Sequence, residues 1–504
     1  MRDFARWSGR VAPDWYELPN DPLRAHASTV TGTREIHDRA RRSLWLVMSR
    51  QALVAVVTFG SGVVLARTLS PADFGVFAIA TFVVVFVGLI ADLGLHSALI
   101  QRASLSTHEL RAAFTAQQVA AATAFALLWP AAALLPRIYP DAAPELVGLV
   151  RLMSADLFLL SWCRPSEALL ERSLRYDRLV PIDVAGATMY GATAIVLALS
   201  GAGVWSFGVA WVASTVTRLA LVYRAAPWSI GLVRDSTAAR EILRIGAPLQ
   251  LSRVVAQAQY WVTPTVVAAT IGPAAAGLLQ WAAGNGRKPL DVLEYLARVS
   301  LPHFSRLQHD EREVERTLTR YVTGFVLVSS LWLAVLAVAG RDLVQFIYTD
   351  RWLPALRAMI LFAAVALLVS VRVIVTTALA GMGRTMLVGR LTMWGALATI
   401  VASIALVPAI GMLGVPLGQL AGAAVVLPWL VAGLGPDAVS SVRRAGAAAL
   451  LPTSIAIGVG IAVRFLPLAA APRGILTAVA MAVAFTAVGW TMGPRWIRDL
   501  RWPR

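Results

Sequence analysis

The most chemically informative residues of this sequence are cations that lie inside long apolar stretches. They are Arg50, Arg253, Arg287, Lys288 and Arg372. A charge at the centre of a membrane-spanning helix costs about 2.5–3.5 kcal/mol, so it normally faces a cavity or a partner. Because guanidinium groups bind phosphate oxygens through paired hydrogen bonds, these positions predict a site for an anionic group. Arg50 lies only about 9 Å into its stretch, so a side chain that reaches the membrane surface is an equally good interpretation.

Two amides accompany one of these cations on a single helical face. At about 100° per residue, Gln250, Arg253 and Gln257 fall on the same side of a helix. We expect this polar face to point toward the protein interior rather than toward lipid, which makes all three residues candidates for substrate contacts.

Arg287 and Lys288 stand beside two acids and a helix-interrupting proline. Asp291 and Glu294 follow them in the same apolar stretch, after Pro289. Asp291 has the helical spacing to neutralise either cation, which would make the group a self-paired cluster. We favour a water-filled path, because two cations that share one nearest acid retain positive charge. Asp291 and Glu294 are also candidates for binding a coupling ion.

Three aspartates lie in other apolar stretches. Asp92, Asp156 and Asp183 could each bind a coupling ion or pair with an arginine. We favour pairing, and we keep Asp92 as a candidate ion site. Arg151 and Arg218 lie closer to the ends of their stretches, so we expect their side chains to extend to the membrane surface.

The sequence lacks the patterns of common catalytic and metal sites. Lys288 is the only lysine, and its neighbours do not form the phosphate loop of ATPases. Cys163 is the only cysteine, so it cannot form a disulfide within the chain, and the six histidines show no metal-ligand spacing. No nucleophile elbow or zinc-protease motif is present. We expect no catalytic residue, no metal and no cofactor.

The elements that carry these residues are predicted to be membrane-spanning helices. Of the 504 residues, 58% are hydrophobic and 14% are charged, whereas soluble domains carry roughly 25% charged residues. Apolar stretches of about 20 residues, long enough to cross a bilayer, recur roughly fourteen times. The net charge of +17 comes from arginines in the connecting loops, which indicates membrane topology rather than nucleic-acid binding. Their excess in alternate loops predicts that both termini are cytoplasmic.

A short internal repeat indicates two lobes. Pro71 and Gly75, between the first two spans, match Pro273 and Gly277, between the seventh and eighth. The match fits a parallel duplication of six spans, although proline and glycine also punctuate unrelated helical turns. We predict a cytoplasmic polar tail (1–43), an N-terminal lobe (44–224), a C-terminal lobe (225–434), and two final spans with a basic tail (435–504).

Several motifs resemble one family of membrane transporters. The motif LARTLSPADFGVF at 65–77 is followed by ADLGL at 91–95 and ALIQR at 98–102. Over about residues 44–435 the sequence resembles the Wzx-type polysaccharide flippases of the multidrug/oligosaccharidyl-lipid/polysaccharide exporter superfamily. The further motifs that carry the resemblance are LLERSLRYDR at 169–178, LRIGAPL at 243–249, FSRLQ at 304–308 and RWLPA at 351–355.

The resemblance implies an all-α polytopic membrane protein, with two six-helix lobes in a V around a central cavity and two C-terminal helices. It implies translocation of undecaprenyl-pyrophosphate-linked oligosaccharides across the inner membrane, for O-antigen, capsule or exopolysaccharide biosynthesis. In related lipid II flippases, arginines of the first and seventh spans are thought to hold the pyrophosphate, and Arg50 and Arg253 occupy similar positions here. Membrane lipids and a polysaccharide polymerase with its chain-length machinery are the expected partners.

Two other functions are compatible with the same architecture. An ion-coupled multidrug or small-molecule exporter would favour an acidic, aromatic-lined cavity for cationic drugs, whereas the cations here favour an anionic cargo. A membrane glycosyltransferase or polymerase would need a large extramembrane loop, but the longest candidate, residues 300–320, resembles a charged helical connector. We therefore expect a transporter and not an enzyme, with no nucleic-acid partner.

Overall fold

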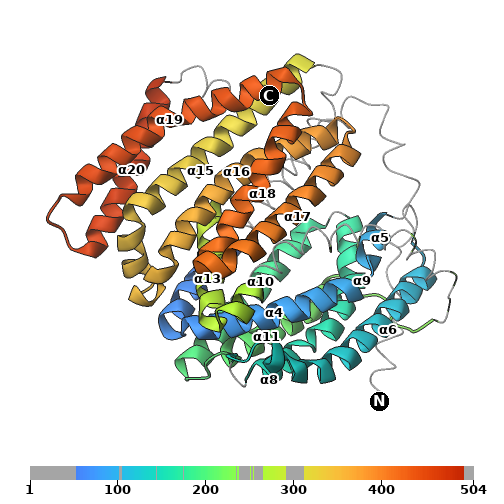
Figure 1. The fold of residues 1–504 in the computed structure, drawn as a ribbon. Coiled ribbons are helices and arrows are strands. Elements are labelled where there is room, and N and C mark those ends of the chain that lie inside the picture. The colour runs from blue at the N-terminus through green and yellow to red at the C-terminus, as the bar shows by residue number, and fades with distance from the viewer. Residues whose placement is uncertain are drawn as a thin grey trace. The chain divides into compact units, whose positions relative to one another are not determined.

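In the part of the chain that it describes, the computed structural model is built from helices alone (Figure 1). The chain divides into two compact units, which we call unit 1 (Met1–Leu69 and Ala80–Val254) and unit 2 (Ser70–Ile79 and Val255–Arg504). The described residues are 53–101, 105–142, 145–173, 175–233, 235, 237, 244, 250, 254, 265–290 and 311–492.

Unit 1 is a helical bundle with α9 near its centre. Its elements are a first helix Leu53–Thr68, the larger part of α4 (Pro71–Ala91), α5 (Leu95–Gln101), α6 (Thr107–Ala131), η1 (Ala132–Leu134), α7 (Leu135–Ile138), α8 (Glu145–Met153), α9 (Asp156–Arg172), α10 (Tyr176–Leu199) and α11 (Trp205–Ala225). α9 packs against α5, α6, α10 and α11, and α11 also packs against α8.

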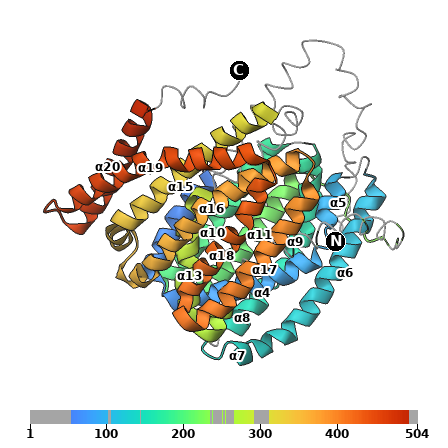
Figure 2. The same ribbon diagram turned by 45° about the horizontal axis from the view of Figure 1, so that its top comes forward.

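Unit 2 contains the start of α4 and the longer helices of the chain. The others are α13 (Pro273–Gly286), α15 (Glu311–Ile347), η2 (Asp350–Ala355), α16 (Leu356–Gly381), α17 (Thr385–Ile410), η3 (Gly411–Leu413), α18 (Gly414–Ala432), α19 (Pro436–Arg464) and α20 (Ala470–Met492). In unit 2, α15, α16, α18 and α17 lie side by side in that order (Figures 1 and 2).

The described helices are long and apolar enough for a multi-pass membrane protein. Nine candidate spans occur among the described residues, and two shorter apolar helices, Leu53–Thr68 and Pro472–Val488, accompany them. One candidate span, Thr385–Ala432, contains both α17 and α18. The prediction of an all-α polytopic membrane protein is confirmed. The predicted seventh span, 242–271, lies mostly outside the described residues.

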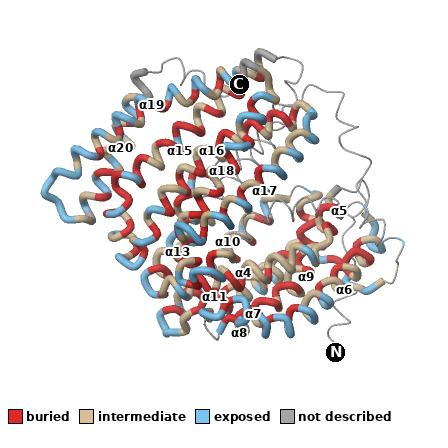
Figure 3. The backbone as a smooth tube through the Cα atoms, viewed as in Figure 1, coloured by how far each residue is buried: buried red, intermediate tan, exposed pale blue. Residues whose placement is uncertain are grey.

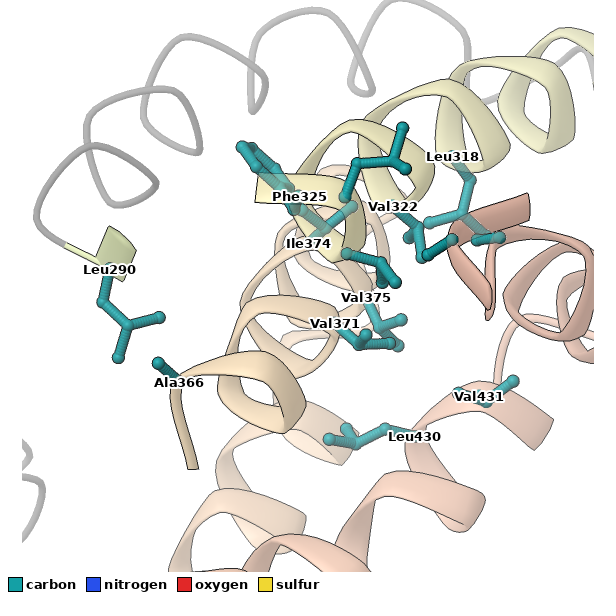
Figure 4. Packing of buried hydrophobic residues seen from close by; sticks show 14 of the residues in the cluster. Leu290, Leu318, Val322, Phe325, Ala366, Val371, Ile374, Val375, Leu430 and Val431 are labelled. Carbon is teal, nitrogen blue, oxygen red and sulfur yellow. The ribbon is translucent and has the colours of Figure 1, made fainter. Parts of the chain in front are cut away.

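The interior of unit 2 forms around α15 and α16. In each of these helices 56% of the most apolar stretch is buried, against 22% for α19 (Figure 3). Val322 and Phe325 of α15 pack with Ile374 and Val375 of α16 and with Leu430 of α18 (Figure 4). β-branched and aromatic side chains on facing helices give this core a dense and rigid packing.

The hairpin of α19 and α20 is fastened to α15 by ion pairs. Arg473 of α20 donates to both carboxylate oxygens of Asp342, at 2.9 and 3.0 Å, and Asp342 is buried. Toward the other end of α15, Arg444 of α19 donates to Glu315. The two contacts fix the hairpin near both ends of a long helix.

The two matching proline-glycine junctions contact each other inside unit 2. A Cβ atom on Gly75 would overlap the carbonyl oxygen of Pro273, and a Cβ atom on Gly277 would overlap the carbonyl oxygen of Pro71. The first turns of α4 and α13 therefore cross at backbone contact, and each glycine is required because no side chain fits. The crossing is reciprocal, since each helix supplies one glycine and one carbonyl oxygen.

The motif SPADFG prepares α4 for this crossing. The Ser70 amide donates to Asp73 Oδ2 at 2.8 Å and the Asp73 amide donates to Ser70 Oγ at 3.2 Å, which is a capping box. Phe74 then packs edge-on against Trp352, a residue of the RWLPA motif, with ring centroids 4.9 Å apart. Trp281 of α13 stacks on the same Trp352 at 4.9 Å. Residues far apart in the sequence thus meet around the crossing.

Two of the predicted spans are interrupted in unit 1. Leu93 and Gly94, which separate α4 from α5, have φ angles of 52° and 71°. A positive φ is costly for leucine, so the contacts around ADLGL must hold this bend in place. The second interruption is a turn at Ser154 and Ala155, which separates α8 from α9 within the candidate span Glu145–Arg172.

Candidate functional site

A small cavity inside unit 2 brings two of the predicted cations together. It is formed by α16, α17, α18 and the residues that follow α13, and its volume is about 40 Å³. At roughly 10–15 Å³ for each water, it holds about three water molecules. Its lining residues are Arg287, Leu290, Val365, Val369, Arg372, Gly395, Thr399, Gln419, Gly422, Ala423 and Val426.

Arg287 reaches the cavity because α13 ends one residue before it. A Cβ atom on Gly286 would overlap the Met359 carbonyl oxygen, so the glycine lets α13 pack closely on α16. The Arg287 guanidinium lies 4.6 Å from the ring centroid of Phe362 and donates a hydrogen bond to Gln419 Oε1. The aromatic face and the amide oxygen orient the cation.

Arg372 of α16 is the second cation that lines the cavity. Its side chain is half-buried, and it forms no ion pair with a carboxylate among the residues that the structure describes. The described lining residues include two arginines and no aspartate or glutamate. Two like charges facing one small space attract an anion with several acceptor oxygens, such as a phosphate.

Neutral hydrogen bonds hold the end of α13 that carries Arg287. The Tyr348 hydroxyl donates to Asn285 Oδ1 at 2.8 Å, and the Trp332 indole N–H donates to the Gly286 carbonyl at 3.0 Å. Burial raises the pKa of Tyr348 to about 12, so this hydroxyl remains a donor at neutral pH.

Glycines give α17 and α18 the close approach that shapes the other wall. Gly418 and Gly422 of α18 face Ser403 and Thr399 of α17 so closely that a Cβ atom on either glycine would overlap the neighbouring side chain. This small-residue spacing is typical of membrane helix pairs. Gln419 follows Gly418 directly and was not predicted as a site residue. The sequence signal that could have identified Gln419 is an amide side chain in an apolar span, next to Gly418 and near Gly422.

The other predicted cavity residues do not gather at this place within the described structure. Lys288 is exposed, next to Arg287. Gln250 is buried in unit 1, where its amide donates to the Leu89 carbonyl oxygen. Five predicted site residues lie outside the described residues, namely Arg50, Arg253, Gln257, Asp291 and Glu294.

Asp92, the predicted ion site of unit 1, is paired. Its Oδ1 lies 3.5 Å from Arg164 Nε and accepts a hydrogen bond from Gln117 at 3.2 Å. Arg164 also contacts Glu167 at 3.2 Å. The residue therefore has the arginine partner that the sequence favoured, and its role in ion coupling stays a prediction.

Arg218 corrects one expectation from the sequence. We expected it to extend to the membrane surface, but its Nε donates to Glu167 at 2.6 Å and its Nη1 donates to Asp183. The reason is that α9 and α10 present carboxylates within its reach, which the distance to the end of a span does not reveal. Arg151 bonds the Trp129 carbonyl at 3.2 Å and lies over the Trp129 ring.

Comparison with known proteins identifies the class. Residues 64–357, more than half of the chain, match the family described as polysaccharide biosynthesis protein. The chain belongs to this family of membrane proteins, and the resemblance drawn from the sequence motifs is confirmed.

The curated relatives agree with this assignment. The chain is 25% identical over 314 residues to the succinoglycan biosynthesis transport protein ExoT of Rhizobium meliloti. The aligned region covers 61% of this chain and 62% of ExoT. It is also 22% identical over 289 residues to the teichuronic acid biosynthesis protein TuaB of Bacillus subtilis. This aligned region covers 56% of this chain and 59% of TuaB. The chain thus spans about three fifths of the length of these relatives.

Solved structures share the fold. The lipid II flippase MurJ in an inward closed conformation matches with a TM-score of 0.73 at 12% identity, over 88% of this chain and 98% of MurJ. An inward-facing multidrug resistance transporter of the MATE family, from the MOP superfamily, matches with a TM-score of 0.58 at 16% identity, over 80% of this chain and 98% of that transporter. At these identities the likeness concerns the fold alone.

Proposed function

We propose that this protein is a flippase that moves undecaprenyl-pyrophosphate-linked oligosaccharides across the inner membrane for the synthesis of a surface polysaccharide. The observation that carries the proposal is the cavity of unit 2, where Arg287 and Arg372 face the same space and Gln419 is the neighbouring amide. A pyrophosphate offers several acceptor oxygens, which guanidinium groups bind with both charge and direction.

The size of the cavity limits which part of the substrate it can hold. Room for about three waters suits one phosphoryl group and excludes a sugar chain. In the proposed mechanism the two arginines therefore bind the phosphate end of the lipid, the saccharide occupies a separate hydrated space, and the polyprenyl chain stays in the bilayer. Alternating exposure of the phosphate site to the two membrane faces then moves the headgroup.

The charge of the cavity favours this cargo over that of a drug exporter. A cationic drug would meet two arginines among the described lining residues, which repel it. The family membership and the relatives named for polysaccharide biosynthesis support the same cargo class. In this proposal both termini are cytoplasmic, the protein is not an enzyme, and a polysaccharide polymerase with its chain-length machinery receives the product.

The proposal is tested by translocation in reconstituted vesicles. Lipid-linked oligosaccharide is placed in one leaflet, and its arrival in the other is followed for the wild type, Arg287→Gln and Arg372→Gln. Loss of a charged hydrogen bond costs about 1.5–3 kcal/mol, so we expect each variant to be slower by about tenfold or more.

Arg390→Gln is the matched control, because Arg390 is an exposed arginine of α17 outside the lining of the cavity. It should translocate at the wild-type rate. Translocation at the wild-type rate by both cavity variants would refute the assignment of the site. Absence of translocation by the wild type would refute the proposed function.

A further inference from the structure

The charged side chains inside unit 1 form a network in which three acids have arginine partners. Arg164 contacts Asp92 and Glu167, and Arg218 contacts Glu167 and Asp183. All three acids are at least 90% buried. Each carboxylate of this group is compensated by a guanidinium, as buried charges in membranes require.

Asp156 lies in the same unit and has no such partner. It is only 8% exposed, and its Oδ1 atom is shielded from solvent without a hydrogen-bond partner. It forms no ion pair among the residues that the structure describes. A buried carboxylate without an ion-pair partner is disfavoured relative to its neutral form.

The backbone around Asp156 is interrupted. Ser154 and Ala155 form the turn between α8 and α9, with the Ala155 amide bonded to the Leu152 carbonyl three residues back at 3.2 Å. Asp156 is the first residue of α9, and the Thr215 hydroxyl, the Trp211 indole and Arg164 favour its ionised form. Burial and these polar groups thus act on this carboxyl in opposite directions. A group held between opposing influences is suited to gain and lose a proton.

The elements packed on α9 place few charges near this carboxyl. Arg164, two turns along α9, acts on it electrostatically, and Thr215 and Trp211 of α11 face it with a hydroxyl and an indole N–H. Cys163 of α9 is close enough to feel its charge. Polar or charged groups on the other neighbouring helices have partners of their own. These pairs are Gln118 of α6 with Ser161, His96 of α5 with Glu171, Asp183 of α10 with Arg218, and Arg151 of α8 with the Trp129 carbonyl.

We propose that Asp156 is the proton-binding site that couples transport to a proton gradient. The carboxylate takes up a proton from water on one membrane face, an O–H bond forms, and the same bond breaks when the proton is released to water on the other face. The proton site itself does not depend on the proposed function. Only the identity of the cargo whose transport the proton drives depends on it. The sequence leaves Asp156 open as an ion site but favours its pairing with an arginine, and it keeps Asp92, Asp291 and Glu294 as the candidates.

A proton fits this site better than a metal cation. Arg164 and the indole N–H of Trp211 both direct positive charge toward the carboxyl, which opposes a second cation that needs several oxygen ligands. A proton needs one oxygen, and Oδ1 is an oxygen without a partner.

Infrared difference spectroscopy of the purified protein in lipid tests the proposal without substrate. The C=O stretch of a protonated carboxyl is followed during a pH titration that starts at about pH 6, where exposed carboxyls are already ionised. We expect the wild type to show a protonated-carboxyl band that disappears as the pH rises, and Asp156→Asn to lack it. Asp92→Asn should keep the band, because that acid is paired with Arg164.

Two further variants secure the result. Asp177→Asn removes a carboxylate that is 52% exposed and should leave the band unchanged. Asp156→Glu retains a carboxyl and should show the band at a shifted frequency, which separates loss of the proton from failure to fold. If the wild type shows no titrating band, or if Asp156→Asn retains it, the proposal is overturned.

Transport then separates this inference from the proposed function. In vesicles with a pH gradient, the wild type should translocate lipid-linked oligosaccharide faster than without the gradient, and Asp156→Asn should translocate at one rate in both conditions. If the protein shows the titrating band but does not translocate lipid-linked oligosaccharide, the proton site is supported and the proposed cargo is refuted. A gradient response in Asp156→Asn would refute the coupling role.

Discussion

The arginines inside unit 1 contact carboxylates, whereas those of the cavity in unit 2 face a space without a described carboxylate. Arg164 and Arg218 each bridge two acids. Around the cavity, an amide and an aromatic ring contact Arg287, and most of the described lining that it shares with Arg372 is apolar. The same residue type is therefore a structural link in one unit and a potential ligand in the other. Burial alone does not tell the two apart, and the identity of the neighbours does.

The largest effect that we predict is the loss of an acid from unit 1. Glu167→Gln removes the carboxylate shared by Arg164 and Arg218, and we expect it to lower the free energy of unfolding by about 3 kcal/mol. Denaturant titration in detergent measures the change. Glu171→Gln, at an acid that is 36% exposed, should cost less than about 1 kcal/mol. Equal costs would show that the network does not stabilise the unit.

A change of size rather than charge should act on unit 2. Gly277→Ala places a methyl group on the Pro71 carbonyl oxygen, and we expect a loss of about 1–3 kcal/mol in the same measurement. Gly284→Ala is the matched control in the same helix, where a methyl group meets open space and alanine is the better helix former. That variant should be neutral or slightly more stable. A similar loss in both variants would contradict the close crossing.

A smaller effect is expected where unit 2 relies on a neutral hydrogen bond. Tyr348→Phe removes the donor to Asn285, and we expect a loss of about 1 kcal/mol. Burial raises the pKa of Tyr348 to about 12. Since the hydroxyl stays protonated well above neutrality, the difference between variant and wild type should be the same at about pH 6 and pH 9. A difference that vanished at the higher pH would show that the hydroxyl had ionised.

The smallest effect on stability should come from a cation of the cavity. Arg372→Gln removes a charge that has no described acidic partner, so we expect a change within about 0.5 kcal/mol. The same variant should lose affinity for inorganic pyrophosphate, measured by calorimetry, by about tenfold or more. A large loss of stability with unchanged pyrophosphate binding would show that Arg372 has a structural role, like Arg164 and Arg218 in unit 1.

Much of the fold follows from the sequence because its signals are local. A stretch of about twenty apolar residues defines a span by itself, and the motifs with Pro71 and Gly75 define the start of one. The turn at Ser154 and Ala155 was not predicted, because neither residue is a helix breaker.

The site was predictable in part for the same reason. Arg287 and Arg372 were identified as charges in apolar surroundings, a feature visible in the sequence. Partners are not visible in this way. The sequence could not show that Arg218 meets Glu167 and Asp183 from two other helices. Nor could it show that Asp156 forms no ion pair with a described arginine, whereas Asp92 and Asp183 do.

The backbone crossing of α4 and α13 has a mechanical consequence. In it, the Cα hydrogens of Gly75 and Gly277 point at the carbonyl oxygens of Pro273 and Pro71, and no side chain lies between. A contact without side chains has no rotamers with which to follow a displacement, and its attraction falls steeply over less than 1 Å. Because each helix supplies one glycine and one carbonyl oxygen, a displacement of α4 relative to α13 would weaken both contacts at once.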